Sequence, residues 1–550
     1  MAVPTQGLVF RPDAGRERRS GLACLTELES AIRQRSTLDA LLRAGELECF
    51  LADRLLVDHA GGGAFPVPPS QPNLQPKQSQ DLTSALARAL VFPEHEVREL
   101  DAALRQLREV RVPVTDVVEL AAPEGFAYYA LHPLDYAAAA RGLDRSRPWA
   151  VVGIRGIGAT LSAIAAAVLD ADRITVRPQG HPYDRKLELD ALTLPWVRGR
   201  MQAGCRFLVA DEGPGLSGSS FLSTGEALLA AGVRADDVTF LCSRKPEPEQ
   251  LVAPSAAVRW KRFHCVTAAS PGMKPSDAEP LAGWDWRRQF LTEDEQQWPA
   301  VWTQMSAPKW ISRDRKRFYR FEGLGRYGAA LRDRSQQLYE AGWGPQPADA
   351  GNGYSNFAIL DLPQINTLSH DAMAAIAEYC AFRAGAFSVT TCDARALEDM
   401  ANFNLEQLGS RELLKLPVER PVIADARMMP YEWRRRRAGD SLWKLDAAAH
   451  GDGHFFPGPC DIAWDLAGAV VEWKMDSAAS EAFLGRYRQA SGDDASLRIA
   501  PYLTAYCAFQ NAYARMAAAA TAACAESARL GADAERYGKA ALPLSAMMNA

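Results

Sequence analysis

The chain has 550 residues, of which 48% are hydrophobic and 23% are charged, and its formal net charge is −5. This balance excludes a general attraction to nucleic acid or to membrane surfaces, so an anion site would have to be local. The ten cysteines form no CxxC pair, the opening residues MAVPTQGLVFRPDAG hold no apolar signal core, and no apolar run reaches the ~20 residues of a membrane span. We therefore expect a cytoplasmic protein without a structural zinc site and without a membrane segment.

A length of this order predicts about three domains. Residues 20–57 alternate leucines with charges at helical spacing, and the tract Gly61–Gln80 is rich in Gly, Pro, Gln and Ser, which predicts a linker. We therefore expect a helical N-terminal segment and linker over residues 1–80, a second domain over 81–270 and a third over 284–550.

Residues 82–107 have the periodicity of a helix, and the runs 114–121 and 126–131 are typical of short strands. The second run belongs to an aromatic group that could stack on a planar base but would more often be core, namely Phe126, Tyr128, Tyr129, His132 and Tyr136.

The stretch Trp149–Leu169 predicts a buried strand, a glycine-bearing turn and a helix of small residues. The turn contains Arg155, Gly156 and Gly158, whose guanidinium and backbone N–H groups suit a phosphate. The next segment, Arg173–Asp190, predicts a strand followed by a turn that carries Arg177, His181, Arg185 and Lys186. A basic, solvated hairpin is an equally good interpretation of that turn.

The most informative stretch is Phe207–Val233, FLVADEGPGLSGSSFLSTGEALLAAGV. Its first four residues have the apolarity of a buried parallel strand, and a helix pattern follows the Gly/Ser loop. Such a loop, at the end of a strand and the start of a helix, offers N–H groups and a positive dipole end to a phosphate. The acids Asp211 and Glu212 would repel a phosphate, so we expect them to hold ribose hydroxyls or Mg²⁺. The simpler alternative is an ordinary strand-to-helix turn.

This stretch resembles the 5-phosphoribosyl 1-diphosphate (PRPP) motif of type I phosphoribosyltransferases: four apolar residues, two acids and a loop that ends in a T-G-x-T-like segment. With Asp211 and Glu212 as the acidic pair, the loop is one residue longer than in the family, and with Glu212 first, Gly213 takes the second position. The resemblance implies that the 5-phosphate is bound by Gly215, Ser217, Gly218, Ser219 and Ser220.

The same resemblance implies that the upstream turn, with Arg155, Gly156 and Gly158, receives pyrophosphate. It also implies a mobile basic loop, with Arg185 and Lys186, that closes over the diphosphate. The implied substrates are PRPP with Mg²⁺ and a nucleobase-like acceptor. The alternation of strands and helices over residues 149–242 agrees with a parallel-sheet α/β domain that binds its ligand at the carboxyl ends of the strands.

In the third predicted domain, Gly323, Gly325 and Gly328 spell GxGxxG between a strand-like FYRF and a helix pattern. A lone GxGxxG is a weak sign of nucleotide binding, and no regular alternation of strands and helices follows it. The distal part is more informative: a strand-like run 442–445 delivers Asp446, and Asp461 and Asp465 follow in PCDIAWDLAGA.

This distal part resembles aminoglycoside phosphotransferases and choline kinase-like small-molecule kinases, and so implies an α+β, protein-kinase-like fold with Mg²⁺ and with ATP as a candidate substrate. Asp425 matches the catalytic-loop acid, Asp446 the magnesium ligand and Asp465 the acid that braces the catalytic loop. The chain departs from the family pattern before Asp425, where Val422, Ile423 and Ala424 include no histidine at the usual spacing. It also departs at Pro430 and Arg320, which stand where a metal-binding asparagine and a nucleotide-binding lysine belong. Local replacements could come from Glu432, His450, Asp452 and His454.

The sequence thus supports two hypotheses. In the first, a phosphoribosyl-transferring enzyme, with Asp211 and Glu212 as catalytic acids, is coupled to a kinase-like phosphotransferase domain. In the second, both domains bind PRPP or a nucleotide without turnover, and the kinase-like domain is degenerate. The sequence leaves a homodimer open.

Overall fold

The computed structural model divides the chain into two compact units. The α/β unit comprises Arg16–Lys274 with Leu324–Arg326, and the α+β unit comprises Met1–Gly15, Pro275–Gly323 and Tyr327–Ala550. The predicted boundary near residue 80 is therefore not a boundary between compact units, because the N-terminal helices belong with the parallel sheet. The structure describes residues 9, 17–60, 76–110, 117–120, 123–181, 183–268, 274–281, 285–365, 367–390, 392, 394–411, 413–436, 442–451, 455, 458–521 and 524–547. Most of the predicted linker Gly61–Gln80 lies outside them.

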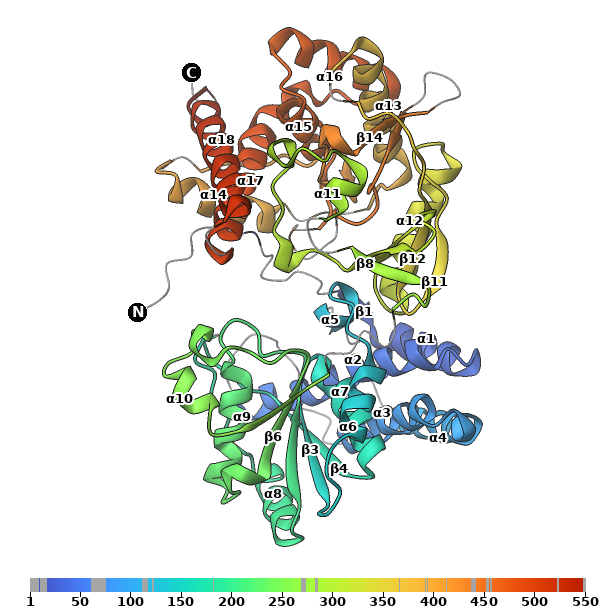
Figure 1. The fold of residues 1–550 in the computed structure, drawn as a ribbon, viewed down its shortest axis with the longest axis vertical. Coiled ribbons are helices and arrows are strands. Elements are labelled where there is room, and N and C mark those ends of the chain that lie inside the picture. The colour runs from blue at the N-terminus through green and yellow to red at the C-terminus, as the bar shows by residue number, and fades with distance from the viewer. Residues whose placement is uncertain are drawn as a thin grey trace. The chain divides into compact units, whose positions relative to one another are not determined.

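The α/β unit is built on a parallel sheet with the strand order β4-β3-β5-β6-β7, which is a doubly wound order (Figure 1). Its strands are β3 (Trp149–Ile154), β4 (Asp172–Val176), β5 (Arg206–Ala210), β6 (Val238–Cys242) and β7 (His264–Thr267). The inner strands β3 and β6 are buried along their whole length, as expected of strands covered on both faces.

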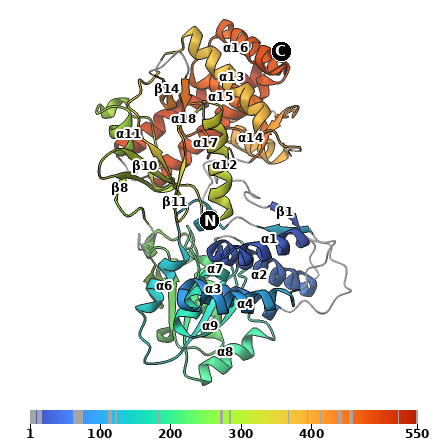
Figure 2. The same cartoon turned by 90° about the vertical axis from the view of Figure 1, so that its right-hand side faces the viewer.

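Helices cover both faces of this sheet. One face packs against α8 (Thr193–Gln202), α9 (Ser219–Ala230) and α10 (Ala256–Trp260), whose side chains share a core with alternate residues of the strands. The other face packs against α7 (Ile157–Leu169). Three further helices pack on α7, and two of them, α2 and α3, are seen beside it in Figure 2: α2 (Thr37–Ala60), α3 (Pro76–Val91) and α6 (Pro133–Arg141).

The remaining elements of the unit are short or peripheral. They are β1 (Glu17–Ser20), α1 (Gly21–Arg33), α4 (Glu96–Leu107), β2 (Val117–Leu120), which pairs with β1, and α5 (Glu124–Ala127). The single helix predicted over 82–107 is two helices, because Pro93 begins a separate 3-10 turn. The strand predicted over 126–131 is wrong, since this run starts inside α5.

The α+β unit begins with an antiparallel sheet of order β11-β12-β10-β9-β8. Its strands are β8 (Ala278–Leu281), β9 (Lys309–Ser312), β10 (Arg317–Phe321), β11 (Ala348–Gly351) and β12 (Tyr354–Ala358). Helix α12 (Arg326–Glu340) connects β10 to β11, and α11 (Asp285–Phe290) follows β8. Strand β10 confirms the strand predicted for FYRF.

Helices dominate the rest of this unit: α13 (His370–Ala386), α14 (Arg395–Gln407), α15 (Ala463–Glu472), α16 (Ser477–Ser491), α17 (Ile499–Ala520) and α18 (Ala525–Met547). Two small antiparallel pairs lie among them: β13 (Pro421–Val422) with β16 (Cys460–Asp461), and β14 (Trp433–Arg435) with β15 (Leu442–Lys444). The predicted α+β class is confirmed for this part, and so are the strand before Asp446 and the helix that contains Asp465.

Candidate functional site

The two glycine-bearing turns of the α/β unit lie at the same edge of the sheet. Strands β3 and β5 are parallel neighbours, with Gly153 opposite Ala210, so the loops that leave their carboxyl ends are adjacent. The contact is close: a Cβ on Gly158 would lie 2.7 Å from the carbonyl oxygen of Ala210 and 3.1 Å from Oδ1 of Asp211. The structure thus brings together the residues that the sequence assigned to two halves of one diphosphate site.

The two acids point to different neighbours. Asp211 lies beside Gly158, whereas Oε2 of Glu212 accepts a hydrogen bond from the backbone N–H of Gly125, at 3.0 Å, which fixes α5 over the end of β5. The Tyr136 hydroxyl donates to the backbone carbonyl of Asp211, at 2.7 Å. Asp211 therefore faces the proposed pyrophosphate turn, and Glu212 faces the segment that carries the aromatic group.

Both acids have raised pKa values. Burial raises the pKa of Asp211 to about 7, against the opposing effects of a backbone hydrogen bond and of the nearby charges of Arg177 and Arg185. Burial, followed by the charges of Glu124 and Asp211, raises the pKa of Glu212 to about 8. Acids perturbed in this way, at the end of a parallel strand, mark a candidate functional site.

The Gly/Ser loop after β5 leads directly into α9. Gly218 has a left-handed backbone, with a φ of 67°, and serves as the N-cap residue of the helix. The hydroxyl of Ser217 accepts a hydrogen bond from the backbone N–H of Ser219, at 3.2 Å, and Arg244 donates to the carbonyl of Gly215, at 3.3 Å. Gly215 and Ser217 precede α9, and Ser220 lies in its first turn. The backbone N–H groups at the start of a helix have no acceptor within the helix.

Only some of the basic residues that the sequence assigned to the site act on Asp211. Arg185 and Arg177 act electrostatically on Asp211, and burial lowers the pKa of Arg185. Lys186 instead pairs with Asp184 at 2.7 Å, with 70% of its side chain exposed. Lys186 also exchanges both backbone hydrogen bonds with Gln179, so this residue has the solvated-hairpin arrangement.

Arg155 is the most unusual cation of the site. Only 10% of its side chain is exposed, and its Nε lies 3.0 Å from Oδ1 of Asp53 but makes no hydrogen bond of good geometry. Its terminal nitrogens have no hydrogen-bond or ion-pair partner among the residues that the structure describes. Burial lowers its pKa, as expected for a desolvated guanidinium. The buried Nε is thus a donor without a good acceptor, whereas the terminal nitrogens are not buried and can bind an anion.

Sequence reasoning missed Asp53 and Cys49, both on α2. Asp53 pairs with Arg155 and also with Arg177, and the Cys49 thiol lies 3.2 Å from both the backbone nitrogen and the carbonyl oxygen of Gly156. The only sequence signal was that two polar residues stand four positions apart on a helix, which is too common to be informative.

In the α+β unit, Asp465 braces the loop of Asp425 as the kinase resemblance implies. Its carboxylate accepts hydrogen bonds from the backbone N–H groups of Asp425 and Ala426, both at 2.8 Å. The Asp425 side chain, however, is 0% exposed. It accepts a hydrogen bond from Tyr379 and lies 3.5 Å from Nζ of Lys444. These contacts give the Asp425 carboxylate structural partners, and its catalytic role stays a prediction.

The predicted magnesium ligand Asp446 is also engaged. It forms an ion pair with Arg320, the residue that stands in place of the family's lysine, and its own φ is 56°. Nε2 of His450 lies 3.5 Å from the same carboxylate, while Glu432 pairs with Lys444. Arg320 thus takes the carboxylate that the resemblance assigns to Mg²⁺. The other two suggested replacements, Asp452 and His454, lie outside the described residues.

The glycines of the GxGxxG segment have a structural explanation. Gly323 and Gly325 have φ angles of 121° and 54°, which favour glycine. A Cβ on Gly328 would lie 2.0 Å from the carbonyl oxygen of Gly323, so the turn from β10 into α12 is packed too closely for a side chain. Their predicted nucleotide-binding role is therefore not needed to account for them.

The described residues add no metal cluster to these sites. No group of three or more His, Cys, Asp or Glu side chains among them has an arrangement that could hold a metal ion.

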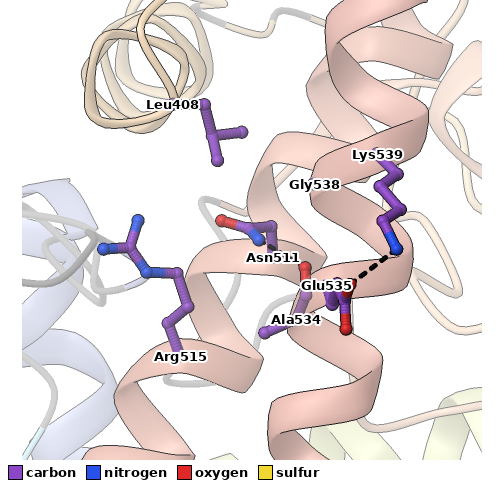
Figure 3. Close-up of a pocket in the computed structure, with 7 residues that line it drawn as sticks. All are labelled: Leu408, Asn511, Arg515, Ala534, Glu535, Gly538 and Lys539. Atoms are coloured by element: carbon purple, nitrogen blue, oxygen red, sulfur yellow. Dashed lines mark hydrogen bonds and ion pairs between the residues drawn. The ribbon is translucent and has the colours of Figure 1, made fainter.

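A cavity of about 320 Å³ lies between α14, α17 and α18, far in sequence from every predicted site residue (Figure 3). It is lined by Leu408, Asn511, Arg515, Ala534, Glu535, Gly538 and Lys539. None of the described helices combines the length and the apolarity needed to cross a membrane.

No family model matches the chain, and no curated protein matches it. Among solved structures, it is similar to a choline kinase from Streptococcus pneumoniae, with 13% identity, 44% of this chain and 89% of the other covered, and a TM-score of 0.32. A choline/ethanolamine kinase family protein from Mesorhizobium loti has 15% identity, covers 44% and 90%, and has a TM-score of 0.31. An aminoglycoside phosphotransferase from Alicyclobacillus acidocaldarius has 13% identity, covers 44% and 90%, and has a TM-score of 0.29.

Proposed function

We propose that the α/β unit binds PRPP with Mg²⁺ and transfers its phosphoribosyl group to a nucleobase-like acceptor. The observation that carries the proposal is the juxtaposition of Arg155, whose terminal nitrogens have no hydrogen-bond partner among the described residues, with Asp211 across the ends of β3 and β5. A ligand that presents an anion to the arginine and hydroxyls to the acid satisfies both groups. A diphosphate-bearing sugar is such a ligand.

The reaction breaks the bond between ribose C1 and the diphosphate oxygen and forms a bond from C1 to a nitrogen of the acceptor. The acceptor nitrogen supplies the electron pair, and pyrophosphate leaves with the electrons of the broken bond. The ribose passes through an oxocarbenium-like state, so the protein contributes mainly positioning and charge stabilisation. Arg155 and the backbone of Gly156–Gly158 hold the leaving pyrophosphate, and the 213–220 loop holds the 5-phosphate.

The acids have separate tasks in this scheme. Asp211, beside the pyrophosphate turn, holds a ribose hydroxyl or Mg²⁺, which commonly binds one or two carboxylates together with substrate phosphates. Bound Mg²⁺ would neutralise charge that develops on the leaving diphosphate. Glu212, fixed by Gly125, holds the other hydroxyl and faces the acceptor side. Burial disfavours the ionised forms of both acids and thereby raises their pKa values. A cation or hydroxyl donors at the site would favour the ionised forms.

The experiment is isothermal titration of the full chain with PRPP, with and without MgCl₂, followed by pyrophosphate release with a panel of purine, pyrimidine and pyridine bases. We expect Mg²⁺-dependent binding that weakens at least about tenfold in Asp211→Asn. Asp236→Asn is the matched control, because that side chain is 81% exposed and belongs to the same unit. Binding of neither PRPP nor pyrophosphate would overturn the proposal.

The second candidate function is binding without turnover, and one observation favours it for the α+β unit. Asp425 is enclosed and Asp446 is paired with Arg320, so neither carboxylate is arranged for phosphoryl transfer. We expect no ATP hydrolysis or phosphate transfer that depends on Asp446. A wild-type activity that is lost in Asp446→Ala and kept in the exposed control Asp476→Ala would restore the kinase assignment.

A further inference from the structure

We propose that helix α2 is part of the anion site: Asp53 is a positioning residue that holds Arg155 and Arg177 together, with their free donors presented to a bound pyrophosphate. This inference rests on the proposed function of the α/β unit. It assigns a role to the N-terminal helices, which the sequence marked only as packing elements.

The contacts of Asp53 leave terminal guanidinium nitrogens of both arginines without a partner among the described residues. Asp53 meets Arg155 through Nε, which is the side of the guanidinium group, at 3.0 Å. It meets Arg177 through Nε, at 3.1 Å, and through one terminal nitrogen. Both terminal nitrogens of Arg155 and one of Arg177 remain without a partner among the described residues. A carboxylate that competed with the ligand would instead occupy the terminal fork of Arg155.

The charge arrangement agrees with this geometry. Two guanidinium groups that share one carboxylate keep a net positive charge, and the paired carboxylate offsets their mutual repulsion. Burial acts to lower the pKa of Arg177, but the charge of Asp53 and its hydrogen bond outweigh this effect and raise it. Arg177 also acts on Asp211, so the arginines connect α2 to the acid of the proposed site.

Helix α2 packs against α7 beside these groups. Gly45, Cys49 and Asp53 recur at intervals of four and therefore share one face of the helix. A Cβ on Gly45 would lie 2.0 Å from Oγ1 of Thr160, so α2 lies against the first turn of α7. Cys49 contacts Gly156, the N-cap residue of α7, and burial raises the pKa of its thiol to about 12, so it is a neutral contact.

A second ion pair on α2 provides a control. Glu48 is 0% exposed and makes two hydrogen bonds, of 2.9 and 2.7 Å, to Arg173 on β4. No hydrogen bond or ion pair of Glu48 with Arg155 or Arg177 is found among the described residues, and its charge is the smallest of the influences on the pKa of Arg155. Glu48→Gln therefore weakens the attachment of α2 without removing a direct contact of the arginines of the site.

The experiment measures the dissociation constant of inorganic pyrophosphate, with MgCl₂, for the full-length wild type, Asp53→Asn, Asp53→Glu and Glu48→Gln. We expect Asp53→Asn to weaken binding about tenfold or more, as loss of a supporting partner commonly does, and Asp53→Glu to restore most of it. Glu48→Gln should lower the melting temperature and leave the affinity of the folded protein within twofold. With an active acceptor base, Asp53→Asn should raise the KM for PRPP and leave the KM for the base unchanged.

Three outcomes are decisive. Wild-type affinity in folded Asp53→Asn overturns the role of Asp53 and leaves the proposed function standing. Equal weakening by Glu48→Gln and Asp53→Asn also overturns it, because general docking of α2 would then be responsible. Should Asp53→Asn not fold, Asp53→Ser takes its place with the same expectation. If wild type binds neither pyrophosphate nor PRPP, the proposed function fails and this inference fails with it.

Discussion

The carboxylate of Asp465 accepts a hydrogen bond from the backbone N–H of Asp425, at 2.8 Å, and a second from the next residue at the same distance. Helix α15 thereby fixes the backbone of a loop that lies 40 residues earlier in the chain. This arrangement keeps the loop in place, although the Asp425 side chain itself is enclosed.

Asp465→Ala should lower the free energy of unfolding of the α+β unit by about 3–5 kcal/mol, because it leaves two buried N–H donors without their acceptor and removes the negative charge 3.6 Å from the buried Arg383 guanidinium. Urea unfolding followed by tryptophan fluorescence checks this, since Trp433 and Trp464 lie in the core of the unit. Asp476→Ala is the control: it removes only an exposed N-cap and should cost about 1 kcal/mol. Equal losses in both variants would contradict the bracing role.

Asp425 and Tyr379 should behave as one buried unit. Asp425→Asn removes the charge, and Tyr379→Phe removes the hydroxyl, from one hydrogen bond. Each change should lower the free energy of unfolding by about 1–3 kcal/mol, and the double variant should lower it by less than the sum of the two. A double-mutant cycle of unfolding free energies measures the coupling. Additive losses would show that the two groups are energetically independent.

Gly158→Ala should destabilise the α/β unit by about 1–3 kcal/mol and weaken pyrophosphate binding, because the added Cβ would press on the carbonyl oxygen of Ala210 and on Asp211. Gly199→Ala in α8 is the matched control, since no atom lies within 4 Å of its Cβ position. There the change should be neutral or stabilising by up to about 1 kcal/mol. Thermal unfolding and pyrophosphate titration of both variants test the difference.

The ligand-free α/β unit should become less stable as the pH rises from about 4.5 to 8. Glu212 has a folded-state pKa of about 8 against an ordinary value of 4.5, so over this range the folded state retains a proton that the unfolded state has lost. Its favourable contribution is complete below the unfolded pKa and is lost at about 1.4 kcal/mol per pH unit up to the folded pKa.

Glu212→Gln should therefore flatten the dependence of the unfolding free energy on pH, measured in urea at pH 5, 6, 7 and 8. Part of the slope should remain, because Asp211 titrates with a pKa of about 7. Glu249→Gln, in which an exposed acid that pairs with Lys261 is neutralised, serves as the control and should keep the wild-type slope. A wild-type slope in Glu212→Gln would show that Glu212 is ionised in the folded protein.

Local patterns predicted much of the fold. The apolar run before Asp211 and the helix after the Gly/Ser loop are β5 and α9, because a buried strand and a helix start have short-range signatures. The run 126–131 was misassigned as a strand because its aromatic residues favour strands, whereas the hydrogen bond from Gly125 to Glu212 holds its start in a short helix.

The site was only partly predictable, because its contacts are distant in sequence. That Arg155, Gly158 and Asp211 meet followed from the rule that neighbouring parallel strands end at one edge. The pairing of Asp446 with Arg320 and the enclosure of Asp425 depend on how β10, α13 and β15 pack. This packing cannot be predicted from the spacing of residues in the sequence. Asp53 was missed for the same reason: its partners Arg155 and Arg177 lie more than 100 residues away.

The buried pair between Glu48 and Arg173 also has a consequence during synthesis of the chain. The two residues are separated by 125 positions, so at about 5–20 residues per second α2 leaves the ribosome roughly 6–25 s before its partner on β4 is made. During this interval Glu48 has no counter-ion on β4, and water must solvate its charge. Helix α2 therefore cannot become fully buried early in folding. It completes its docking only when β4 has been synthesised.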